Sequence, residues 1–158
     1  MVLIESKRPF LLLAVIIALA GFIVFQRYQD FTEGKTIRIY TAAGAVKLDV
    51  EYAETPEKWE QGLMGREFLR ENSGMIFIFP DEKIRDFWMK DTLIPLDAIF
   101  ISTSGVVKEI ASLEPCPAPV GCPVYESKNP ARFVVEINAG SAERLKITPG
   151  DILEISGF

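Results

Sequence analysis

The sequence contains no histidine and only two cysteines. Without an imidazole, neither a Ser-His-Asp nor a Cys-His arrangement can form, and the usual general base near neutral pH is missing. A structural zinc site needs more thiol and imidazole ligands than two cysteines supply. The glycines form neither a dinucleotide-binding pattern nor a Walker loop. We therefore predict no catalytic set and no cofactor, and lean against an enzyme.

Basic charge is also scarce. Beyond residue 28, 14 Lys and Arg residues stand against 21 Asp and Glu residues, a net charge of −7, and no basic cluster interrupts that balance. Affinity for nucleic acid comes largely from neutralising phosphates with basic side chains. The sequence therefore predicts no nucleic-acid partner.

Charge is absent altogether from residues 9–25, PFLLLAVIIALAGFIVF. A helix of this length spans about 25 Å, slightly less than the roughly 30 Å of a bilayer's hydrocarbon core. The stretch predicts a single-pass membrane anchor within residues 1–28. A short polar linker, 29–35, would join it to one domain formed by residues 36–158.

The flanks of the apolar stretch predict its orientation. Lys7 and Arg8 precede it, which favours a cytoplasmic N-terminus and a C-terminal domain outside the cytoplasm. The alternative is a cleaved secretory signal, with Ala18-Leu19-Ala20 as the cleavage site and a periplasmic or secreted product. Against cleavage, Phe22 to Phe25 would then be exposed at the new N-terminus.

The two cysteines, Cys116 and Cys122, lie in the proline-rich segment PCPAPVGCP. Outside the cytosol, two nearby cysteines most simply form a disulfide. Closing so short a ring would contribute about 2 kcal/mol on the chain-entropy model. Free thiols and a metal site are the alternatives.

Alternation of apolar and polar residues predicts strands. Residues 36–41 and 45–53 alternate with period two and predict an antiparallel hairpin. Residues 74–79, GMIFIF, are nearly all apolar, so we expect a strand covered on both faces. Further strands are expected at 84–90, 95–102, 105–113, 132–138 and 152–156.

Two short helices complete the expected elements. The first follows Thr55, which can cap the free amides, with Pro56 at its first position and an end by Gly65. The second covers residues 141–146. Seven or eight short strands with two helices predict a mainly β (α+β) domain, either a compact distorted β-barrel or two packed sheets.

Two long motifs carry a family resemblance. GLMGREFLRENSGMIFIFP (62–80) followed by FWMKDTLIPLDAIF (87–100) resembles the domain of unknown function 192 family, as does ARFVVEINAG (131–140). The resemblance covers roughly Ile37 to Ile155. It implies a small β-rich domain, often exported or membrane-tethered, and supplies no mechanism.

Charged residues within the second motif need an explanation. Asp97 shares the apolar face of its strand with Ile99 and Ile101, so burial would require a partner, and Lys90 or Arg66 could provide one. We expect Lys90 and Asp97 to form an ion pair that holds the turn, with Asp91 in that turn. The alternatives are a site in which Lys90 and Arg66 hold an anionic or polar ligand, and catalysis by Lys90 and Asp97.

Three methionines, Met64, Met75 and Met89, lie inside the family motifs. Thioethers could bind Cu(I) outside the cytosol. Methionine also fills irregular cores and contacts aromatic rings, which is the favoured interpretation.

A third group consists of Glu136, Tyr125 and Ser127. Alternation in RFVVEIN places Phe133, Val135 and Ile137 inward and Glu136 on the other face. A solvated carboxylate at the rim is the expected result. Alternatively, Glu136 and Tyr125 could line a polar cleft with Arg66.

The leading hypothesis is a membrane-tethered binding or accessory domain with a cleft for a small polar or anionic ligand. Its candidate binding residues are Arg66, Phe79, Trp88, Met89, Lys90, Asp97, Tyr125 and Glu136. One alternative is an enzyme acting on the cell envelope through the carboxyl pair Asp97 and Glu136. Another is a structural module that docks on an envelope protein.

Overall fold

The computed structural model describes residues 17, 19, 21, 35–116 and 121–155. The chain divides into two compact units, residues 1–33 and 34–158. The anchor expected in residues 1–28 lies outside the described residues apart from three isolated positions, and so does most of the linker. In the described part of the chain, no helix combines the length and apolar character that crossing a bilayer requires.

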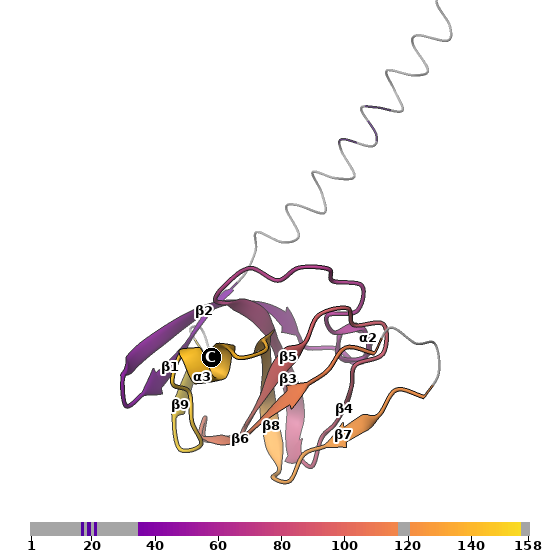
Figure 1. The fold of residues 1–158 in the computed structure, drawn as a ribbon. Helices are drawn as coiled ribbons and strands as arrows, with labels where there is room; N and C mark the ends of the chain where they lie inside the picture. The colour runs from indigo at the N-terminus through magenta and orange to yellow at the C-terminus, as the bar shows by residue number, and fades with distance from the viewer. Residues whose placement is uncertain (1–16, 18, 20, 22–34, 117–120, 156–158) are drawn as a thin grey trace, which may run out of the picture. The chain divides into compact units, whose positions relative to one another are not determined.

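The second unit is mainly β, as predicted, and its described part holds nine strands and two short helices (Figure 1). In chain order these are β1 (Lys35–Thr41), β2 (Gly44–Ala53), α2 (Pro56–Gln61), β3 (Ser73–Lys83), β4 (Asp86–Trp88), β5 (Leu96–Ile101), β6 (Val107–Leu113), β7 (Val124–Glu126), β8 (Ala131–Asn138), α3 (Ser141–Arg144) and β9 (Ile152–Ile155). Strand β7 was not predicted, because three residues are too few to show alternation.

Seven strands form one curled sheet in the order β6-β5-β8-β3-β2-β1-β9, and β4 pairs with β7 in a small second sheet. The edge strands β6 and β9 approach each other. The amide of Val107 donates to the carbonyl of Asp151 at 2.8 Å, and that of Leu153 donates to Gly105 at 2.7 Å. The expected distorted barrel is therefore present as a partly closed, curled sheet.

Strands β3, β5 and β8 are buried on both faces, which produces two cores. The first, here called the inner core, lies on one face of the curled sheet and includes Ala142 of α3. Its fully buried members include Ile37, Ile39, Leu48, Val50, Ile76, Ile99, Ile101, Val135 and Ile137. The second, the outer core, lies on the opposite face of β3, β5 and β8; it includes Leu63, Met75, Phe77, Phe79, Phe87, Met89, Ala98, Phe100 and Val134.

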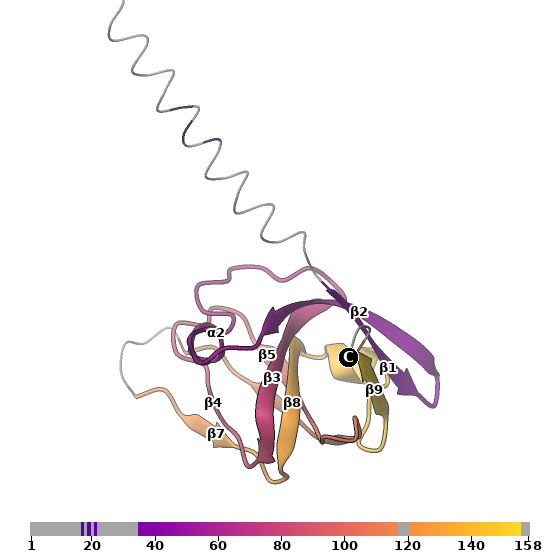
Figure 2. The same cartoon turned by 180° about the vertical axis from the view of Figure 1, so that it is seen from behind.

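The covering elements occupy opposite ends of the unit. Figures 1 and 2 place α3 with β1 and β9 at one end, and α2, β4 and β7 at the other. The expected burial of residues 74–79 on both faces is confirmed. The outer core therefore exists because segments distant in sequence cover a second face of the central strands.

Helix α2 begins as predicted and ends earlier than expected. The hydroxyl of Thr55 accepts from the amide of Lys58 at 3.4 Å, and Pro56 opens the helix. At Gly62 the backbone turns to φ 45°, and its amide donates to Lys58 at 2.9 Å. The indole of Trp59 donates to the carbonyl of Ala53 at 2.9 Å, which fixes α2 against the end of β2.

Candidate functional site

A pocket of about 390 Å³ lies on the outer-core side of the sheet, within the size range of small-molecule sites. Helix α2 and the segment after it contribute part of the lining, and β3, β4 and β8 contribute most of the rest. The lining residues are Trp59, Glu60, Gln61, Gly62, Leu63, Met64, Phe77, Phe79, Asp86, Phe87, Trp88, Thr92 and Glu136.

Aromatic side chains dominate the walls and hold one another in place. Trp59 and Phe79 have ring centroids 4.9 Å apart. Phe87 packs edge-on against Phe77 at 5.1 Å and against Phe79 at 6.5 Å. Such pairs each contribute about 0.5–1.5 kcal/mol beyond the area that they bury. The walls are therefore largely pre-formed.

Glu136 is the unusual member of the lining. It lies on β8 between its register partners Met75 on β3 and Ala98 on β5, and only 4% of the residue is exposed. Among the described residues, the Glu136 side chain has no hydrogen bond or ion pair, and it reaches the pocket surface. Burial raises the pKa of its carboxyl to about 8, so the group is largely protonated at pH 7.

The expected solvated position of Glu136 is therefore wrong. Glu136 does line a cleft, but Tyr125 and Arg66, which the alternative placed there with it, are not part of the lining. The alternation of β8 was interpreted correctly: Val135 and Ile137 belong to the inner core. The opposite face is nevertheless covered by the outer core, where Val134 packs. Glu136 thus lies on a buried face of β8, next to Val134.

Tyr125 does not accompany Glu136 but bonds to a second buried carboxyl, Glu109. Besides the Tyr125 hydroxyl, Glu109 accepts from the amides of Lys128 at 2.8 Å and Asn129 at 3.1 Å. Burial acts to raise the pKa of Glu109, but these hydrogen bonds outweigh it and the pKa is lowered. Burial, followed by the bond to Glu109, raises the pKa of Tyr125 to about 12.

Sequence reasoning missed Glu109, although a signal was present. In β6 the buried positions alternate, and Glu109 shares its face with Ala111 and Leu113 of the outer core. A carboxyl at such a position must find donors or lose its charge. Glu109 and Glu136 show the two outcomes, because only Glu109 is surrounded by donors.

The expected ion pair between Lys90 and Asp97 does not form. Asp97, 2% exposed, accepts from the hydroxyl of Ser112 at 2.7 Å and from the amide of Ala142 at 3.0 Å, on the inner-core side of the sheet. The ammonium of Lys90 lies 5.2 Å from the ring centroid of Trp88. Burial did oblige Asp97 to find partners, but they come from β6 and α3.

Asp97 and Glu136 also fail the geometric requirement for a carboxylate pair. Asp97 lies opposite Ile137, and Glu136 lies opposite Ala98, so the two acids occupy neighbouring positions of the β5–β8 ladder. Neighbouring positions point to opposite faces of a sheet. The two carboxyl groups therefore cannot flank one substrate.

Asp97→Ala is expected to lower the free energy of unfolding by about 2–4 kcal/mol, because it removes a buried cap from the start of α3. The amide of Ala142 and the hydroxyl of Ser112 would both lose their acceptor. Urea unfolding measures the change. Lys90→Ala is the matched control, and its free energy of unfolding should change by less than about 1 kcal/mol. Equal losses of stability in the two variants would instead favour the ion pair between Lys90 and Asp97 that the sequence predicts.

Arg66 pairs with Glu51 and lies outside the lining. Its guanidinium reaches both carboxylate oxygens, at 2.5 and 2.6 Å, and each side chain is 27% exposed. This pair links the segment after α2 to β2.

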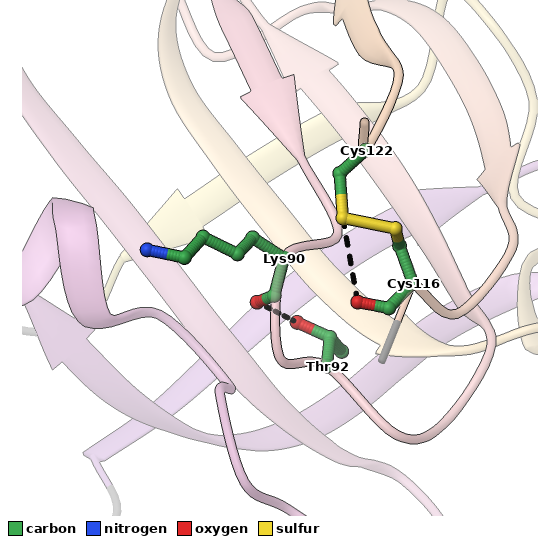
Figure 3. The surroundings of a disulfide bond; sticks show 4 residues. All are labelled: Lys90, Thr92, Cys116 and Cys122. Atoms are coloured by element: carbon green, nitrogen blue, oxygen red, sulfur yellow. Dashed lines mark hydrogen bonds between the residues drawn. A yellow bond between two sulfur atoms is a disulfide. The ribbon is translucent and has the colours of Figure 1, made fainter. Parts of the chain in front are cut away.

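A disulfide loop supports the turn beside the pocket (Figure 3). The sulfurs of Cys116 and Cys122 lie 2.07 Å apart, the bonding distance that the disulfide prediction requires. Asp91 adopts φ 54°, confirming its place in the turn, and its amide donates to the carbonyl of Cys116 at 3.0 Å. Thr92, which lines the pocket, donates to the carbonyl of Lys90 at 3.4 Å, and Figure 3 shows the Lys90 side chain leading away from the disulfide.

The methionines divide between core and pocket. Met75 and Met89 are 7% and 4% exposed and belong to the outer core, whereas Met64 lines the pocket. In the described ranges, no group of three or more His, Cys, Asp or Glu residues could hold a metal ion.

Three of the eight predicted binding residues line the pocket: Phe79, Trp88 and Glu136. The other five lie outside its lining: Arg66, Met89, Lys90, Asp97 and Tyr125. Sequence reasoning missed Trp59, Asp86 and Phe87 as lining residues. Phe87 could have been identified from the apolar content of the two motifs. No local pattern in the sequence distinguishes Asp86 from other surface acids.

Comparisons with known proteins agree with the fold. The family described as "Uncharacterized ACR", domain of unknown function 192, matches residues 38–155. No curated protein matches the chain.

Two crystal structures are similar over most of the domain. One, from Sinorhizobium meliloti 1021, is described as a candidate transcription regulator; it is 36% identical, covers 78% of this chain and 95% of its own, and has a TM-score of 0.70. The other is a protein of unknown function from Novosphingobium aromaticivorans DSM 12444. It is 34% identical, covers 75% of this chain and 83% of its own, and has a TM-score of 0.68. The chain therefore belongs to the domain of unknown function 192 family.

Proposed function

We propose that the domain is a binding module for small organic molecules, and that its binding site is the aromatic pocket containing Glu136. One observation carries this proposal: a buried carboxyl without a partner among the described residues lines a pocket of about 390 Å³. Pockets with mostly apolar walls and a few convergent polar groups are the usual form of ligand sites.

The energetics of Glu136 support a functional role. Holding its carboxyl protonated at pH 7 lowers stability by about 3 kcal/mol, given the rise in pKa from 4.5 to about 8. An apolar side chain between Met75 and Ala98 would avoid that cost. A ligand that bonds to the carboxyl would explain why the position holds an acid.

We further propose that the domain is tethered to the membrane and lies outside the cytoplasm. The uncharged residues 9–25 support an anchor, and the basic residues that precede them support a cytoplasmic N-terminus. The bonded Cys116 and Cys122 suit an oxidising compartment. Cleavage after a signal would give a periplasmic or secreted domain with the same pocket.

The proposal excludes nucleic acid as the partner. The Sinorhizobium meliloti protein is described as a candidate transcription regulator. Residues 29–158 of this chain carry a net charge of −7, and the pocket lining contains three acidic residues and no basic one. A surface of that charge repels phosphates. The same lining argues against the anionic ligand considered from sequence.

Acid–base catalysis by Glu136 is a second candidate function. A carboxyl with a pKa near neutrality can donate and accept protons at physiological pH. Asp86 is a second acid in the same lining. Conversion of a pocket-bound compound by the protein, lost in Glu136→Gln, would distinguish catalysis from binding.

The remaining alternatives have weaker support. A Cu(I) site would need Met75 and Met89 to leave the outer core. An assembly role draws on Trp88 and Val124, register partners on β4 and β7 that are 41% and 60% exposed.

A fragment screen on the full-length chain tests the pocket directly. We expect a subset of uncharged and cationic aromatic fragments to bind and to shift the indole signals of Trp59 and Trp88 in NMR spectra. Met64→Trp fills the pocket from its lining and should weaken binding by about tenfold or more. The matched control is Phe68→Trp, a residue that is 70% exposed and outside the lining.

Two results would contradict the proposal. Either no fragment shifts the indole signals, or the fragments bind Met64→Trp as tightly as the unmodified chain.

A further inference from the structure

The charged groups of the pocket lining all have the same sign. Glu60, Asp86 and Glu136 contribute three carboxyl groups, and no lysine or arginine belongs to the lining. Resting on the proposed binding function, we propose that the ligand is a small organic cation: an amine whose ammonium group pairs with Glu136 and whose apolar body packs against the aromatic walls.

The carboxyl of Glu136 is buried without a partner among the described residues. The residue is 4% exposed, and no described side chain or amide bonds to its carboxyl. Its register partners, Met75 and Ala98, cannot supply a donor from their side chains. A buried carboxylate is stable when it is paired and hydrogen-bonded. An ammonium group provides both, through donors that form strong charge-assisted hydrogen bonds.

The aromatic walls of the pocket also suit a cation. Trp59, Phe77, Phe79, Phe87 and Trp88 line the space around the acid, and the faces of aromatic rings attract cations. Two of these rings already hold a cation of the chain. The guanidinium of Arg85 lies 4.0 Å from the centroid of Phe79, and the ammonium of Lys90 lies 5.2 Å from that of Trp88.

Neither of these two basic groups neutralises Glu136. Arg85 is ion-paired with Asp81 at 2.7 Å and donates to the carbonyl of Ala131 at 2.9 Å. Lys90 stacks on Trp88, and no bond joins either side chain to Glu136 in the described ranges. The acid thus remains available to a ligand.

Binding of an ammonium ion would release a proton. Without a bound cation, burial keeps the Glu136 pKa at about 8 and the group protonated at pH 7. When the cation enters, the carboxyl gives its proton to solvent and the resulting carboxylate pairs with the ammonium. The other titratable groups of the lining, Glu60 and Asp86, are exposed, and the neighbours on β3 and β5, Met75 and Ala98, do not titrate.

Three probes of similar shape and different charge test the inference: benzylamine, benzyl alcohol and benzoate. Isothermal titration calorimetry on the full-length chain at pH 7, in two buffers of different ionisation enthalpy, gives both affinity and proton release. We expect benzylamine to bind about tenfold more tightly than benzyl alcohol and benzoate not to bind. Benzylamine should release about one proton per chain.

Two variants test whether Glu136 is responsible for the binding of benzylamine and for the proton release. Glu136→Gln should weaken benzylamine by about tenfold or more, leave benzyl alcohol within about threefold, and abolish proton release. Glu143→Gln makes the same substitution on α3, at a residue outside the lining, and should leave all three values unchanged.

Three outcomes would contradict the proposal that the ligand is an amine. These are equal binding of benzylamine and benzyl alcohol, benzylamine binding without proton release, and no binding of benzylamine at all. The fragment screen separately decides whether the pocket binds small molecules, so the binding function can survive the loss of the amine.

Discussion

Glu136→Gln is expected to raise the free energy of unfolding by about 3 kcal/mol at pH 7 and by about 5 kcal/mol at pH 9. The folded protein holds the Glu136 carboxyl at a pKa of about 8, against 4.5 for an unperturbed glutamate. Between these values the folded state binds a proton that the unfolded state has lost. The stability of the unmodified protein therefore falls as pH rises from about 4.5 to 8, and then levels off.

Glutamine has nearly the same shape as protonated glutamic acid and does not titrate. The variant should match the unmodified chain near pH 4.5 and exceed it increasingly at higher pH. Urea unfolding from pH 5 to 9 measures both curves, and Glu143→Gln, an exposed residue, is the control, with a change below about 0.5 kcal/mol. A Glu136→Gln variant that is less stable at pH 8 would contradict a neutral, unpartnered carboxyl.

Gly74→Ala is expected to lower the free energy of unfolding by at least about 3 kcal/mol. A Cβ at this position of β3 would lie 2.2 Å from the carbonyl oxygen of Glu136 and 2.9 Å from Cγ2 of Ile137. Both atoms belong to β8, whose backbone is bonded to β3 on one side and β5 on the other. The added methyl group can be accommodated only by separating central strands.

A second glycine separates this clash from a general effect of the substitution. Gly44 has φ 125° and no atom within 4 Å of an added Cβ, so Gly44→Ala should cost only its backbone strain, about 1–3 kcal/mol, with no steric clash. Thermal and urea unfolding of both variants compare the two costs. Equal losses at Gly74 and Gly44 would show that β3 and β8 are less closely packed than the structure indicates.

The sequence predicts the strands better than it predicts what covers them. The hairpin of β1 and β2, the Thr55 cap and the doubly buried residues 74–79 all follow from local patterns. Alternation in β8 shows that its two faces differ. It does not reveal that α2, β4 and β7, which are distant in sequence, cover the second face, and so it misplaced Glu136.

The same reasoning explains the partial prediction of the pocket. Phe79 and Trp88 could be recognised because they belong to the apolar runs of two conspicuous motifs. The partners of Asp97 could not, because Ser112 and Ala142 reach it only through the pairing of β5 with β6 and the placement of α3. Local patterns therefore showed that Asp97 would be buried and need partners, but not which residues those partners are.

At pH 7, Glu136 is expected to be a buried, protonated carboxyl in an aromatic pocket. Titration of the glutamate side-chain carboxyl carbons by ¹³C NMR, with the Glu136 signal assigned by its loss in Glu136→Gln, tests this claim most directly. We predict a midpoint of about 8 for Glu136. A midpoint close to the ordinary value of 4.5 would show that the carboxyl is solvated or paired, and would contradict the account.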